Sequence, residues 1–144
     1  MRVLFIIILF LSFNLNAETK EKLNLRCQSE TYELKNKTET KKKKFNQIFV
    51  FEILISTELN KENENLVLAK IITESVPSCY KYEGSSTDSI FKMKCTKDVP
   101  GLEALYGEQF LRINRITGKF NKISKSELGI TTIVGTCKKA EALF

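Results

Sequence analysis

The spacing of apolar side chains restricts the fold of this chain more than any other feature of its sequence. Within 45–56 (FNQIFVFEILIS), every second residue from Phe49 to Ile55 is large and apolar, while the intervening positions mix polar and apolar side chains. Successive residues of a β-strand point to opposite faces. This period of two therefore predicts a central strand that is buried mainly on one side.

Other alternating or β-branched segments bring the predicted total to about seven strands. These further strands are 23–28, 66–73, 91–95, 109–114, 119–123 and 130–134. The polar stretches 35–44, 58–65 and 83–88 are the predicted loops, and one short helical turn is predicted at 100–106, ahead of Gly107. Strands joined by such short connections pair antiparallel. The sequence thus predicts an all-β fold, either a small barrel or, as the alternative, a two-layer β-sandwich.

The N-terminus has the parts of a secretory signal peptide. Met1 and Arg2 form a short positive start, 3–13 (VLFIIILFLSF) is an apolar core, and Ala17 is a small residue ahead of a polar stretch. We predict cleavage after Ala17, which leaves a single domain at 18–144 in the periplasm or outside the cell. An uncleaved anchor is the alternative, although a spanning helix needs about 20 apolar residues. No later segment has that length, so we expect no transmembrane part after the signal is removed.

The four cysteines fit an exported protein. Cys27, Cys79, Cys95 and Cys137 are an even number, and no two of them form a C-x-x-C pair that would indicate a metal or redox site. Three disulfide connectivities are possible. We favour Cys79 with Cys95, across neighbouring segments, and Cys27 with Cys137, which would join the first strand to the last. That second bond favours a closed barrel over an open sandwich.

The composition excludes several kinds of catalytic site. The chain has no histidine, so it lacks the commonest general base and the commonest metal ligand. Glu52 is the single carboxylate within the apolar strand at 45–56, where it is either a buried acid or base or, as is more usual, a solvent-facing residue. We therefore nominate no catalytic residue, no metal ligand and no cofactor, and we expect that the protein is not an enzyme.

One block of positive charge stands out from the rest of the sequence. The formal net charge is +6, and Lys41, Lys42, Lys43 and Lys44 lie beside two phenylalanines. Such a block favours anionic partners. Export argues against nucleic acid, so these lysines are predicted to contact an anionic envelope component, such as a lipid headgroup or a cell-wall polymer. The alternative is a solvated loop without a partner.

Three short motifs resemble small exported proteins of AT-rich marine bacteria, a group of no known function. The motifs are the early strand cysteine in LNLRCQ (23–28), the hairpin INRITGKF (113–120) and the closing Gly-Thr-Cys (135–137). The likeness covers mainly 108–144, together with Cys27. It implies a β-rich exported domain, and it brings no activity, ligand or catalytic residue with it.

Three classes of function remain, in order of preference. The first is a monomeric binding module for a small ligand, an anionic envelope component or another exported protein, because disulfide-linked β domains present their loops for such work. The second is a structural or accessory envelope protein without a discrete ligand. The third is a small enzyme that uses only lysines and carboxylates.

Overall fold

In the computed structural model, every regular element is a β-strand within the described residues, which are 19–73, 78–98, 100 and 107–140. The strands are β1 (Thr19–Lys35), β2 (Thr40–Lys44), β3 (Ile48–Leu59), β4 (Asn65–Thr73), β5 (Cys79–Ser86), β6 (Ile90–Asp98), β7 (Glu108–Asn114), β8 (Lys119–Ser126) and β9 (Gly129–Lys139). No helix in these ranges is long and apolar enough to cross a membrane. The predicted signal peptide and residues 101–106 of the predicted helical turn lie outside them.

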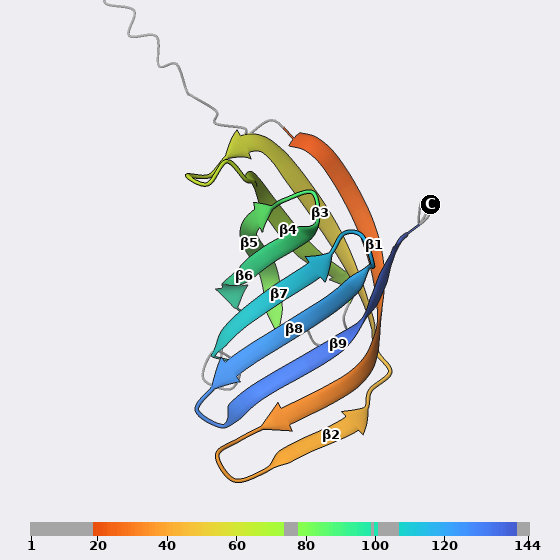
Figure 1. Ribbon diagram of the computed structural model, residues 1–144, viewed down its shortest axis with the longest axis vertical. Coiled ribbons are helices and arrows are strands. Elements are labelled where there is room, and N and C mark those ends of the chain that lie inside the picture. The colour runs from red at the N-terminus through yellow and green to blue at the C-terminus, as the bar shows by residue number, and fades with distance from the viewer. Residues whose placement is uncertain (1–18, 74–77, 99, 101–106, 141–144) are drawn as a thin grey trace, which may run out of the picture.

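The sheet closes on itself as an antiparallel barrel, which confirms the predicted fold class (Figure 1). The barrel strands follow the order β1, β3, β4, β5, β6, β7, β8 and β9, and β9 pairs back onto β1. Because β1 is 17 residues long, its first half pairs with β3 and its second half with β2. β2 therefore extends the sheet beyond the barrel.

Two strands are additional to the predicted seven, and β5 is the first of them. The residues at 83–86, predicted as part of a loop, are the end of this strand. Register shifts against β6 fall on both sides of Lys81, so that Cys79 and Tyr82 are both fully buried although they lie three residues apart. A bulge of this kind interrupts the period of two on which the prediction depended.

β2 is the second additional strand, and it corrects the loop predicted at 35–44. Its five residues are all exposed, so no apolar alternation marks it in the sequence. The turn before it is short, because the Asn36 side chain accepts hydrogen bonds from the backbone N–H groups of Thr38 and Glu39 at 2.9 and 2.8 Å. That turn brings the lysine block back along β1.

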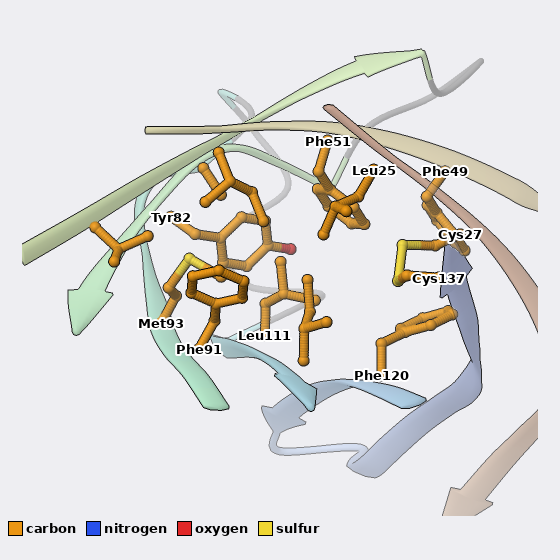
Figure 2. Close-up of a cluster of buried hydrophobic side chains, with 14 of the residues drawn as sticks. Leu25, Cys27, Phe49, Phe51, Tyr82, Phe91, Met93, Leu111, Phe120 and Cys137 are labelled. Carbon is orange, nitrogen blue, oxygen red and sulfur yellow. A yellow bond between two sulfur atoms is a disulfide. The ribbon is translucent and has the colours of Figure 1, made fainter. Parts of the chain in front are cut away.

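Large side chains from facing strands meet in the barrel interior (Figure 2). Phe49 is completely buried there, with ring centroids 6.2 Å from Phe51 and 6.0 Å from Phe120. The other fully buried large side chains include Tyr82, Phe91, Ile53, Leu111 and Ile113. The interior is thus occupied by the protein's own aromatic and aliphatic groups.

Both disulfides join strands that are neighbours in the barrel. Cys27 on β1 bonds Cys137 on β9, at opposite register positions, and Cys79 on β5 bonds Cys95 on β6. This is the connectivity that the sequence favours. The first bond closes the barrel between its first and last strands, 110 residues apart in sequence.

Candidate functional site

The structure divides the lysine block between two faces of the sheet. Lys41 and Lys43 lie opposite Leu34 and Tyr32 on β1, and the Lys43 Nζ is 5.0 Å from the centre of the Tyr32 ring. This face continues the barrel interior, since Tyr32 also lies opposite Ile133, which packs against the core. Lys42 and Lys44 alternate with these residues, so they belong to the outer face.

On the outer face, Lys42 and Lys44 stand at one end of cross-strand rows that begin on β6. One row, from β6 to β2, is Lys92, Arg112, Asn121, Val134, Thr31 and Lys44. The next is Lys94, Phe110, Ile123, Thr132, Glu33 and Lys42. These strands lie side by side in Figure 1, and five strand spacings make each row about 24 Å long.

We call this surface the cationic face and define it by its positive side chains. They are Lys35, Lys42, Lys44, Lys92, Lys94, Arg112 and Lys125, all of which are exposed. Its middle is apolar, with Phe110, Ile123 and Val134 half-buried and Ile130 exposed. The Nζ atoms of Lys94 and Lys125 lie 5.8 and 5.2 Å from the centre of the Phe110 ring. Cations thus flank an apolar strip on both sides.

Lys92 and Arg112 are the strongest evidence for an anion on this face. They lie directly opposite each other on β6 and β7, and in the described part of the chain neither side chain has an ion pair or hydrogen bond. Like charges in opposite positions destabilise a sheet. A surface hollow of about 410 Å³ lies over them, lined also by Ser85, Leu66 and Glu83, whose carboxylate pairs with Lys81 at 2.9 Å. A bound anion would remove this repulsion.

A second hollow lies at the other end of the cationic face. It has a volume of about 630 Å³ and is formed by the β1–β2 and β8–β9 turns, with Lys35, Lys37 and the exposed Leu128 and Ile130 among its lining residues. Apolar and cationic groups therefore occur together here as well.

The acidic candidate of the sequence, Glu52, contributes less to a site. Glu52 is half-buried on the outer side of β3, where its carboxylate lies 3.3 Å from the Lys22 Nζ. This ion pair gives Glu52 a structural partner on the neighbouring strand β1. Among the described residues, no group of three or more cysteine or acidic side chains could hold a metal ion.

Sequence reasoning missed most of the cationic face. Lys92 and Lys94 alternate with buried Phe91 and Met93, which is a local sign that both point outward. Only the strand register places them beside Arg112, and the register of five pairs of strands is needed to connect them with Lys44. The chain matches no protein-family model, no curated protein and no solved structure. We therefore infer its function from geometry and charge.

Proposed function

We propose that this protein is an exported, non-catalytic binding module that holds an anionic polymer of the cell envelope on its cationic face. The observation that carries the proposal is the row in which Lys92 and Arg112 stand together, neither with an ion pair to the described part of the chain, and Lys44 stands at the far end. Cations spread over a row about 24 Å long suit a ligand with repeated negative charge. The apolar strip between them suits the uncharged part of each repeat unit.

Export is supported by the chemistry of the cysteines. None of the four is free, and disulfides persist in the periplasm and outside the cell, whereas the cytosol keeps thiols reduced. The predicted signal peptide points to the same compartments. Both favour an envelope polymer over nucleic acid as the anion.

The shape of the face favours a flexible polymer over a flat bilayer. The outer surface of a closed barrel is convex, so a plane can contact only a few of its strands at once, whereas a chain can follow all of them. A small ligand inside the barrel is less well supported, because aromatic and aliphatic side chains occupy the interior.

Successive lysines of the block point to opposite sides of β2, and this alternation gives a matched test of the cationic face. K42Q/K44Q removes two charges from the outer side, and K41Q/K43Q removes two from the opposite side of the same strand. One lysine near an anionic surface contributes about 1 kcal/mol. We therefore expect K42Q/K44Q to weaken binding to fluorescent dextran sulfate by about 30-fold at low salt, as measured by anisotropy.

K41Q/K43Q has the same net charge and is expected to bind several times more tightly than K42Q/K44Q. Equal losses in both variants would mean that only net charge matters, and this result would refute the proposed face. Binding should also weaken as salt is added, because screening acts on exposed charges. Tighter adsorption to anionic lipid vesicles than to the polymer would instead identify a bilayer as the partner.

The Lys92–Arg112 pair predicts opposite changes in stability and binding. R112Q removes a like-charge repulsion, so the free energy of unfolding is expected to rise by about 0.2 to 1 kcal/mol, while affinity for dextran sulfate falls. Urea denaturation and anisotropy measure the two quantities on the same sample. A loss of stability together with unchanged affinity would show that Arg112 is a structural residue and does not bind the polymer.

A further inference from the structure

A separate hollow of about 400 Å³ lies at the mouth of the barrel. It is enclosed by the start of β1, the β7–β8 turn and the end of β9, and none of its lining residues belongs to the cationic face. Its accessible apolar wall is formed by the half-buried Leu23 and the exposed Ile116, and the buried Leu25, Phe91 and Ile113 also line it. The size is within the range of small-molecule sites, about 300 to 1,000 Å³.

Arg115 is fixed at the rim of this hollow. Its Nη1 donates hydrogen bonds to the Ser86 hydroxyl at 3.0 Å and to the Thr87 carbonyl at 2.7 Å, and its guanidinium carbon lies 4.7 Å from the centre of the Phe91 ring. Its backbone N–H also donates to the Ser89 carbonyl at 2.8 Å. The guanidinium is therefore held in one orientation before any ligand arrives, which lowers the entropic cost of binding.

The other side of the guanidinium faces a weak partner. Arg115 Nη2 lies 3.9 Å from a Glu21 carboxylate oxygen, which is longer than a hydrogen bond between these groups. About a quarter of the Arg115 side chain and 44% of the Glu21 side chain remain exposed. A carboxylate thus already approaches this edge without engaging it closely, and a second carboxylate has room to do so.

We propose that the barrel mouth binds a small amphiphilic carboxylic acid. Its carboxylate accepts hydrogen bonds from Arg115, as the planar guanidinium fork favours, and its apolar body packs against Leu23 and Ile116. Glu21 competes for the same cation. The acidic side chain of Asp88 also lines the hollow, and Lys139 adds a second positive charge at its rim.

Sodium octanoate is a suitable probe, with 1-octanol as its uncharged counterpart. We expect octanoate to saturate one site in a methyl-labelled NMR titration and to shift the resonances of Leu23 and Ile116. Octanol should bind at least about tenfold more weakly, because its hydroxyl has no negative charge and cannot accept the paired hydrogen bonds that a carboxylate accepts from a guanidinium. Equal affinity for the two compounds, or shifts confined to other methyl groups, would overturn the proposal.

Two variants and one matched control test the role of Arg115. R115Q is expected to weaken octanoate binding by about tenfold or more. E21Q removes the competing carboxylate and leaves the hydrogen bonds of Arg115 to Ser86 and Thr87 in place, so it should tighten binding several-fold. R112Q, which alters an arginine of the cationic face, should bind octanoate like the unmodified protein. Unchanged affinity in E21Q would contradict the proposal even if R115Q fails to fold.

The same variants keep this inference distinct from the proposed function. R115Q and E21Q should retain their affinity for dextran sulfate, while R112Q should lose part of it. Failure of octanoate binding with intact polymer binding would refute the mouth site alone. Failure of dextran sulfate binding with intact octanoate binding would refute the proposed cationic face alone.

Discussion

Replacing Cys27 and Cys137 together by alanine is expected to lower the free energy of unfolding by about 4 to 5 kcal/mol. The bond spans 110 residues, so its removal releases most of the chain in the unfolded state. The Cys79–Cys95 bond spans only 16 residues, and its removal by C79A/C95A is expected to lower the same quantity by about 3 kcal/mol. Net stabilities of small domains are about 5 to 15 kcal/mol, so either change is large.

Urea denaturation of the oxidised proteins, followed by circular dichroism, measures both effects. Each variant replaces both partners, which leaves no free thiol to form wrong pairs. Similar losses in the two variants would show that loop length does not determine the effect. In that case the packing of the sulfur atoms, which are buried in the core, would be its main source.

Phe49→Ala is expected to lower the free energy of unfolding by about 3 to 5 kcal/mol. The Phe49 side chain is completely buried, its ring contacts those of Phe51 and Phe120, and the Lys122 Nζ lies 5.0 Å from its centre. Its removal leaves a cavity that the closed barrel cannot readily collapse to fill. The change should appear as a lower urea midpoint with little change in slope.

Ile48→Ala is the matched control, because Ile48 is the preceding residue of the same strand and is 40% exposed. We expect a loss of about 1 kcal/mol or less. If the two variants lost equal stability, Phe49 would not be a buried core residue as described. Together the two residues test the assignment of inner and outer faces along β3.

The fold could be predicted from the sequence wherever one side of a strand is buried in regular alternation. The segment from Phe49 to Ile55 is the clearest case, and its inner residues are all buried. β5 was missed because its bulge at Lys81 shifts the buried side chains by one position. β2 was missed because a strand exposed on both faces needs no apolar residue.

The candidate site was less accessible to prediction. The lysine block is visible in the sequence, but its division into an outer pair and an inner pair follows from its pairing with β1. Lys92 and Arg112 lie 20 positions apart, and only the register of β6 against β7 brings them together. Arg115 at the barrel mouth gave no signal in the sequence, because its role depends on the turn that it contacts.

The position of β2 also affects how copies of this protein meet. Among the described strands, β2 pairs with β1 alone, so its other edge presents backbone N–H and C=O groups to which a strand of a second molecule could add. Lysines at such an edge discourage this contact, because two copies joined there would bring both lysine runs together. The same charges that favour an anionic partner therefore oppose edge-to-edge aggregation. Neutralising them removes a barrier to self-association.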